Sequence, residues 1–166
     1  MAKSKSSKLK SHKAGKAWKM IQAGECYKDI AEAVGHTMTA VKHYARKKFK
    51  DESEKLWAAE IKSTGVCEIS NRTYDLHAHH ILEKSVWPHL SRDLSNGICL
   101  NADYHEFNVE ISPHATLASS EEFLRWLKEN RPGQWEWYQE HKHDRKYQDP
   151  DYEQAYYDLK GLPCKT

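Results

Sequence analysis

The sequence lacks any long hydrophobic run. Of its 166 residues, 39% are hydrophobic and 30% are charged, and no stretch approaches the roughly 20 apolar residues that a membrane-spanning helix needs. The lysine-rich N-terminus has no apolar segment after it, so it does not have the pattern of a secretory signal. We therefore expect a cytoplasmic protein with one ordinary domain or two small ones.

Cysteine is scarce and scattered. Cys26, Cys67, Cys99 and Cys164 form no C-x-x-C pair, which argues against a disulfide framework and against a four-cysteine zinc site. We expect reduced thiols, with Cys67 and Cys99 filling the core.

Acidic residues are nearly absent from the first third of the chain. Residues 1–50 hold 13 Lys and Arg but only three acidic residues, a net charge of +10. Residues 51–166 hold 13 basic and 21 acidic residues, a net charge of −8, so the overall charge of +2 conceals a strong asymmetry. The N-terminal third is therefore the expected contact for a polyanion.

The first 15 residues carry five lysines and almost no apolar side chain. They predict a disordered basic arm over 1–15 that lies along phosphates, although a solvated tail is the alternative. Three short helices are expected next, at 16–23, at 27–34 and from Thr37 or Thr39 to about Phe49. Glycines after the first and second helices mark the turns.

Two helices joined by a glycine turn, with a basic outer face, form the helix-turn-helix arrangement. The stretch GECYKDIAEAVGHTMTAVKHYARKKF resembles helix-turn-helix and Myb-like DNA-binding modules. The resemblance implies a module over 16–50 whose third helix enters the major groove; a helical bundle with a solvated basic face is the alternative. The expected DNA-binding residues are Lys42, His43, Arg46, Lys47 and Lys48.

The most distinctive pattern lies in the segment LHAHHILEKSVWPHLSRDLSNGICLNADYH. Adjacent histidines, His79 and His80, are followed after fifteen residues by Asn96 and after eight more by His105. Neutral imidazole is both a good divalent-metal ligand and a base that titrates near neutral pH. Two such groups side by side, with a third on a later element, suit one metal ion and one proton acceptor in a single cleft.

Apolar patterning predicts the frame that carries these residues. Segments 66–69 and 74–81 flank a turn and are expected to form a β-hairpin, and 98–100 is expected to form a third short strand. Capping residues at 101–103 then predict a helix that includes His105.

The His79-His80 doublet, the segment beginning at Asn96-Gly-Ile-Cys-Leu and His105 resemble the motif of the HNH endonucleases, a branch of the ββα-metal nucleases. The resemblance covers about residues 66–111 and implies an α+β fold with a small ββα-metal core. It also implies hydrolysis of a phosphodiester bond with a divalent ion. The alternative is a set of surface and packing histidines in a histidine-rich protein.

The resemblance also implies roles for single residues. His80 matches the general base, His79 and His105 match the metal ligands, and Asn96 would tie the loop to the backbone, orient the His80 ring or lie near the metal. A rival assignment remains. Neighbours in a strand point to opposite faces, so His77 and His79, which share a face, are the alternative pair of ligands.

The sequence departs from HNH families that carry a structural zinc in two C-x-x-C pairs. Val109 also stands where some relatives have a further ligand. Two protein ligands favour a hydrated Mg²⁺, with Mn²⁺ or Zn²⁺ as alternatives. His89 and His114 are alternative extra ligands or contacts.

Flanking segments are expected to support this small core. Residues 51–65 predict a linker helix, 121–130 and 134–141 predict two further helices, and a short helix is expected at 151–159. A ββα unit cannot build much core alone, so the extension 112–166 is expected to pack its aromatic side chains on it.

Together these features predict a metal-dependent HNH endonuclease acting on double-stranded DNA, with no small-molecule cofactor and no membrane association. Its small size, basic arm and pairing of modules resemble the HNH endonucleases of phage and mobile introns, which would place it in a host-cell cytoplasm. Two rivals remain: a DNA-binding regulator with an inactive ββα unit, and a structural zinc-binding adaptor. RNA or branched DNA stays open as a substrate, and residues 142–166 show no evident role.

Overall fold

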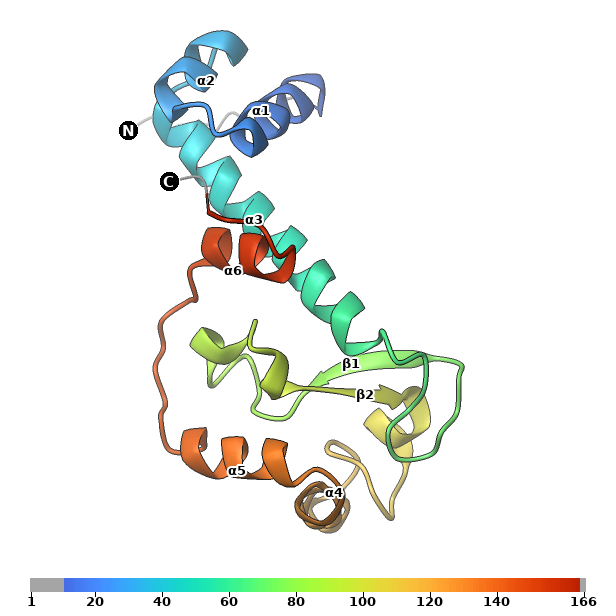
Figure 1. Ribbon diagram of the computed structural model, residues 1–166. Helices are drawn as coiled ribbons and strands as arrows, with labels where there is room; N and C mark the ends of the chain where they lie inside the picture. The colour runs from blue at the N-terminus through green and yellow to red at the C-terminus, as the bar shows by residue number, and fades with distance from the viewer. Residues whose placement is uncertain (1–10, 165–166) are drawn as a thin grey trace, which may run out of the picture. The chain divides into compact units, whose positions relative to one another are not determined.

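A computed structural model of the chain describes residues 11–164 and has mixed α+β structure with one small sheet (Figure 1). The chain divides into two compact units, one formed by Met1–Ser53 with Tyr152–Thr166 and the other by Glu54–Asp151. Of the predicted arm, residues 1–10 lie outside the described part, whereas 11–15 belong to the first helix and not to an arm. Within the described residues, no helix is both long and apolar enough to cross a membrane.

The first unit is helical. It contains α1 (Ser11–Ala23), α2 (Tyr27–Val34), the first part of α3 (Met38–Ile61) and α6 (Tyr152–Leu159). Helix α2 has the predicted bounds, because Ile30, Ala31 and Val34 share one face and are buried.

The turn between α2 and α3 depends on Gly35. Its left-handed conformation (φ 64°, ψ 49°) is one that glycine adopts without steric cost. The amide of His36 then donates to the Ala31 carbonyl at 3.0 Å. The hydroxyl of Thr37 accepts from the Ala40 amide at 3.2 Å, so Thr37 caps α3 as one of the two predicted residues.

Helix α3 is longer than expected. The predicted end near Phe49 and the separate linker helix at 51–65 are wrong, since one helix runs without a break to Ile61. No glycine or proline interrupts Met38–Ile61. Ion pairs one turn apart, Lys47–Asp51 at 2.6 Å and Lys48–Glu52 at 2.8 Å, span the expected boundary.

The C-terminal helix α6 belongs to the first unit. Tyr156 packs edge-on against Trp18 and Phe49, with ring centroids 5.8 and 5.4 Å away, and its hydroxyl accepts from the Gln22 amide at 2.8 Å. The predicted extension 112–166 is therefore divided, because only its part up to Asp151 lies in the unit that contains the sheet.

The second unit contains a two-stranded antiparallel sheet. Strand β1 (Leu76–His80) pairs with β2 (Gly97–Asn101), and His80 lies opposite Gly97. The predicted hairpin between 66–69 and 74–81 is wrong, because residues 66–69 form a turn closed by hydrogen bonds between Cys67 and residues 71–72. The true partner of β1 is the strand predicted as the third.

The core of this unit lies between β2 and the helix α4 (Leu117–Asn130), which α5 (Pro132–His141) follows. Trp126 and Trp135 pack on this core, as expected of the aromatic side chains in this part of the extension. Its fully buried members are Cys67, Ile98, Leu100, Phe123 and Leu127.

The cysteines are all free thiols, and Cys67 and Cys99 are buried as expected. Gly97 permits the end of α3 to approach β2, because a Cβ atom there would lie 2.1 Å from the Ile61 side chain.

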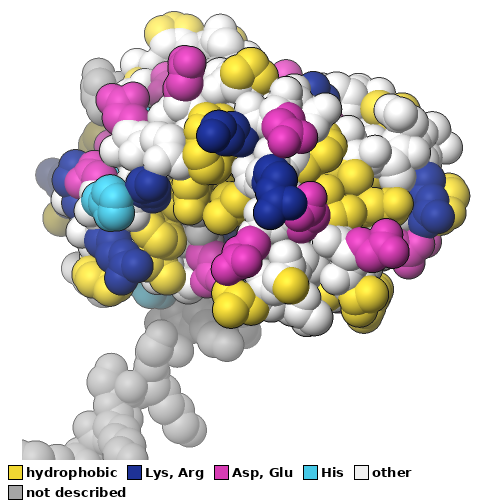
Figure 2. Space-filling view, turned by 90° about the horizontal axis from the view of Figure 1, so that it is seen from below, with side chains coloured by type: hydrophobic (Ala, Val, Ile, Leu, Met, Phe, Trp, Pro, Cys, Tyr) yellow, Lys and Arg dark blue, Asp and Glu magenta, His cyan; other side chains and the backbone are white. Residues whose placement is uncertain are grey.

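Basic and acidic side chains alternate over the face that Figure 2 shows, which lies on the side of α4 and α5. Arg125 pairs with Glu122 at 2.6 Å, and Arg131 pairs with Glu68 at 2.6 Å.

Candidate metal and catalytic site

Three histidines from separate segments converge beside β1. The buried ring of His79 lies 5.0 Å from that of His105 and 4.8 Å from that of His114, measured between centroids. One nitrogen from each ring falls within 4.8 Å of the other two, a spacing that can hold one metal ion. The structure therefore brings together the two predicted ligands and adds His114, which the sequence left as an alternative.

Short polar contacts hold this cluster. His105 lies in a single turn, Asp103–Phe107, rather than in the longer helix that was predicted. The buried hydroxyl of Ser112 donates to the His105 carbonyl at 2.9 Å and accepts from the His114 amide at 3.2 Å. Ser112 thus fixes the backbone of two of the three histidines at once.

His77 lies behind His105. The Nδ1 atoms of these two rings are 3.1 Å apart, so one must donate and the other accept. If His105 donates, its Nε2 keeps a lone pair for a metal, and His77 acts as the acceptor that fixes this tautomer. His77 and His105 also form a second group with Glu106 that can hold an ion, so the rival assignment of His77 as a ligand stays open.

His80 extends from the opposite face of β1. Its ring stacks on the indole of Trp57, with centroids 3.9 Å apart and planes 9° from parallel. Its Nε2 lies 3.1 Å from the Ser91 carbonyl. A carbonyl can only accept, so Nε2 carries the proton and Nδ1 keeps the lone pair that a general base requires.

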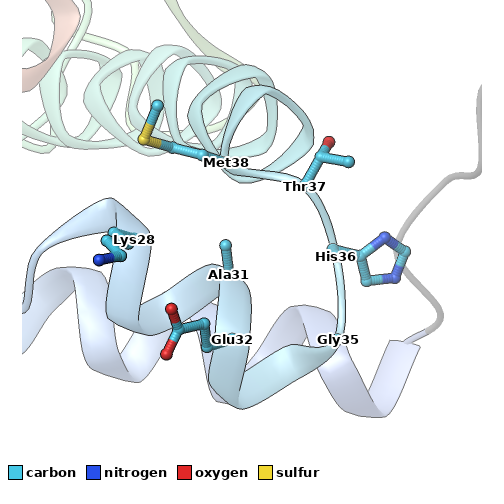
Figure 3. A pocket seen from close by; sticks show the side chains of 7 residues that line it. All are labelled: Lys28, Ala31, Glu32, Gly35, His36, Thr37 and Met38. Atoms are coloured by element: carbon cyan, nitrogen blue, oxygen red, sulfur yellow. The ribbon is translucent and has the colours of Figure 1, made fainter.

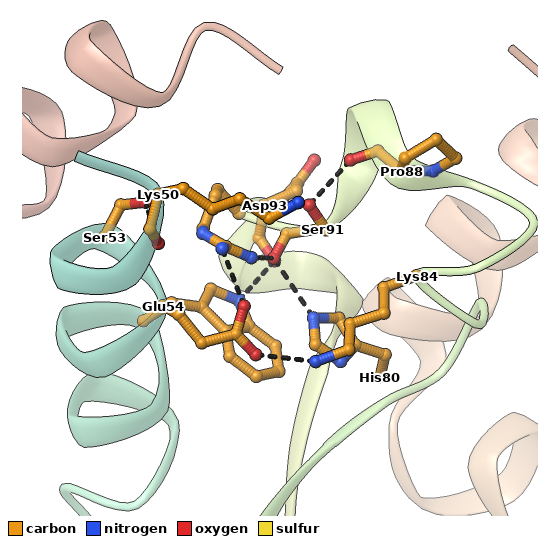
Figure 4. Close-up of polar contacts among 10 residues, drawn as sticks. Lys50, Ser53, Glu54, His80, Lys84, Pro88, Ser91 and Asp93 are labelled. Carbon is orange, nitrogen blue, oxygen red and sulfur yellow. Dashed lines mark hydrogen bonds and ion pairs between the residues drawn. The ribbon is translucent and has the colours of Figure 1, made fainter. Parts of the chain in front are cut away.

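A partly buried ion pair supports the segment behind His80 (Figure 4). Glu54 of α3 accepts from Arg92 at 2.6 Å and from Lys84 at 2.9 Å. Arg92 also donates to the Ser91 carbonyl at 2.9 Å, and the Trp57 indole donates to the Asp93 carbonyl. The Ser91 carbonyl that contacts His80 thus also accepts from Arg92, and the bond from Trp57 ties the next residues of this segment to α3.

Asn96 ties the loop between the strands to the backbone, one of the roles that the sequence left open for it. It is fully buried, its Oδ1 accepts from the Leu82 amide at 2.7 Å, and its Nδ2 donates to the carbonyls of Leu82 and Leu90 at 3.1 Å. These bonds close the chain just after His80. Asn96 is therefore a positioning residue, and its amide is occupied by the backbone rather than aimed at a metal.

The candidate base His80 and two of the candidate ligands, His79 and His114, line one cleft. Neighbours in a strand face opposite ways, but β1 ends at His80, where the chain turns. His79, His80 and His114 consequently line a single hollow of about 310 Å³, together with residues of α4 and Arg145. This placement removes the geometric objection to a ligand and a base at adjacent positions.

Burial favours the neutral form of the His79, His80 and His105 rings. It lowers the pKa of His79 well below the usual imidazole range, and the neighbouring His105 and His114 lower it further. Burial also lowers the pKa of His80 and of His105, although the hydrogen bond to Ser91 opposes the shift at His80. Neutral imidazole is the form that binds a metal or accepts a proton.

The predicted DNA-binding residues all lie on α3. Lys42, His43 and Arg46 are exposed, whereas Lys47 and Lys48 form the ion pairs described above.

A hollow lies between α2 and the start of α3 (Figure 3). The His36 ring points away from the gap between the two helices. The hollow is lined by Lys28, Ala31, Glu32, Gly35, His36, Thr37 and Met38.

Other histidines have structural contacts. His89 Nδ1 donates to the Lys146 carbonyl at 3.1 Å, and His141 Nδ1 donates to the Trp137 carbonyl at 2.8 Å. Comparison with models of known protein families, with curated proteins and with solved structures found no match.

Proposed function

We propose that this protein is a metal-dependent endonuclease of the HNH type that hydrolyses a phosphodiester bond in duplex DNA. The observation that carries the proposal is the shared cleft, which is lined by His80 and by two members of the three-histidine cluster, His79 and His114. A base and a metal site are the two elements that phosphodiester hydrolysis needs.

In this proposal, different residues bind the metal and accept the proton. His79, His105 and His114 would hold a divalent ion, which stabilises negative charge on the phosphate and on the leaving oxygen. His80 Nδ1 accepts the proton of the attacking water. The Ser91 carbonyl then faces the protonated ring and stabilises its charge, while the stack on Trp57 holds the plane of the ring.

Three histidine ligands, in place of the two expected from the sequence, favour a different metal ion. Two ligands and several waters suit Mg²⁺, but three imidazoles suit the borderline ions Mn²⁺, Co²⁺, Ni²⁺ and Zn²⁺ better. We therefore propose Mn²⁺ or another transition-metal ion as the resident cofactor, in place of the Mg²⁺ that the sequence favoured.

Plasmid nicking tests the proposal. Purified protein should convert supercoiled DNA to nicked or linear forms with Mn²⁺, more slowly with Mg²⁺, and not at all with EDTA. Duplex binding without nicking under any ion would favour a DNA-binding regulator. Tightly held stoichiometric zinc without nicking would favour a structural adaptor.

The first unit would supply most of the affinity for DNA. Charge reversal of Lys42 and Arg46 together should weaken binding and make its dependence on salt shallower by about two units of slope, because each phosphate contact contributes roughly 0.9. Fluorescence anisotropy at several salt concentrations measures this slope, with Lys128→Glu on α4 as the control. An unchanged slope would move the contact away from α3. Deleting residues 1–50 is a poorer test, since it would cut α3 in two and leave α6 without its aromatic partners.

A further inference from the structure

The segment after α5 reaches the cleft that contains the histidines. Residues 144–150 have no regular structure, yet Arg145 lines this cleft together with His79, His80 and His114. The sequence pattern assigned no role to this segment.

The backbone on both sides of Arg145 is anchored. The amide of Asp144 donates to the His141 carbonyl at the end of α5, and the Lys146 carbonyl accepts from His89. The Asp144 carboxylate is taken up by Lys146 at 2.8 Å and faces His89 at 3.7 Å. The acidic neighbour of Arg145 is thus directed to other partners.

The guanidinium of Arg145 rests on an aromatic ring. Its central carbon lies 5.1 Å from the ring centroid of Trp87, which also lines the cleft. A cation–π contact of this kind holds the charge in place without neutralising it. In the described part of the chain, Arg145 has no ion-pair partner and is the one lysine or arginine that lines the cleft.

An anion in this cleft would need a cation. Glu83 also lines the cleft and adds a negative charge that an anion would have to overcome. A guanidinium can offer two parallel N–H donors to two oxygens of a phosphate. Donors that are already in place where negative charge develops favour the transition state over the bound substrate.

We infer that Arg145, seated on Trp87, contacts the non-bridging oxygens of the phosphate that is cleaved, across the cleft from His80. This inference rests on the proposed function. It makes Arg145 a catalytic residue supplied by the segment after α5, and it explains why an exposed arginine is stacked beside the histidine cluster.

Single-turnover cleavage by the full-length protein, at saturating DNA and Mn²⁺, tests the inference. Arg145→Ala should slow cleavage on the order of 10²-fold, Arg145→Lys should recover part of the loss, and Arg125→Ala on α4 should cleave as the wild type does. Metal affinity should not change, because Arg145 is not a ligand. Equal rates for wild type and Arg145→Ala, or a fall in metal affinity, would overturn the inference.

Binding to duplex DNA provides a readout that does not depend on cleavage. In EDTA, Arg145→Ala should make the salt dependence of binding shallower by about 0.9, the contribution of one phosphate contact. If the wild type cleaves no DNA with any ion, the proposed function fails and this slope still decides the role of Arg145. A shallower slope keeps the phosphate contact, and an unchanged slope, or no binding at all, removes it.

Discussion

Replacing His80 with alanine should slow DNA cleavage by a factor of roughly 10² to 10⁴, the usual contribution of a general base. The variant removes the Nδ1 lone pair but leaves the three-histidine cluster and the exposed basic residues of α3 in place. DNA affinity and metal affinity should therefore stay close to those of the wild type. Single-turnover cleavage, anisotropy and metal titration measure the three quantities.

Added imidazole separates a lost base from a damaged fold. The ring of His80 is stacked on Trp57, so His80→Ala leaves a flat space that a free imidazole can enter. Partial recovery of cleavage with imidazole, and none with a similar concentration of a non-basic aromatic compound, is the expected result. Cleavage at the wild-type rate without imidazole would transfer the role of the base to His77 or His79.

Replacing His114 with alanine should lower affinity for Mn²⁺ or Ni²⁺ by at least about 100-fold. Loss of an orienting partner alone typically costs 10- to 100-fold in metal affinity, and a direct ligand contributes more. His114 is exposed and its ring fills no core space, so the substitution should leave the fold intact. Isothermal titration of the metal-free protein measures the change.

The matched control is His43→Ala, which removes an exposed histidine of α3 that lies outside the cluster. Its metal affinity should equal that of the wild type. If His114→Ala also binds Mn²⁺ normally, the site is reduced to His79 and His105, and Mg²⁺ becomes the expected ion again. The two results therefore decide between a metal site with three histidine ligands and a site with two histidine ligands whose ion keeps several waters.

Local signals in the sequence predicted the short elements well. Gly35 and the buried face of α2 gave correct bounds because a left-handed glycine and an apolar stripe depend on neighbouring residues alone. The tie of Asn96 to the loop was one of three roles left open for it, and the backbone bonds of its amide select that role. The burial of Cys67 and Cys99 followed from the absence of paired spacing.

These local signals do not predict which distant segments of the chain pair with one another. Strand β1 could pair with either neighbouring apolar segment, and the sequence favoured 66–69 because it lies closer. The convergence of His114 on His79 depends on the contact between Ser112 and the His105 carbonyl, which no periodicity reveals. The same holds for α6, whose tyrosines found partners more than 100 residues earlier in the chain.

The division of the chain also sets an order for its folding during synthesis. The first unit needs Tyr156 to complete its aromatic cluster, so its earlier helices emerge from the ribosome without their last partner. The unit that contains the histidines is complete once Asp151 has been made. Domains fold as units during synthesis. The second unit can therefore fold before α6 is available to pack against the N-terminal helices.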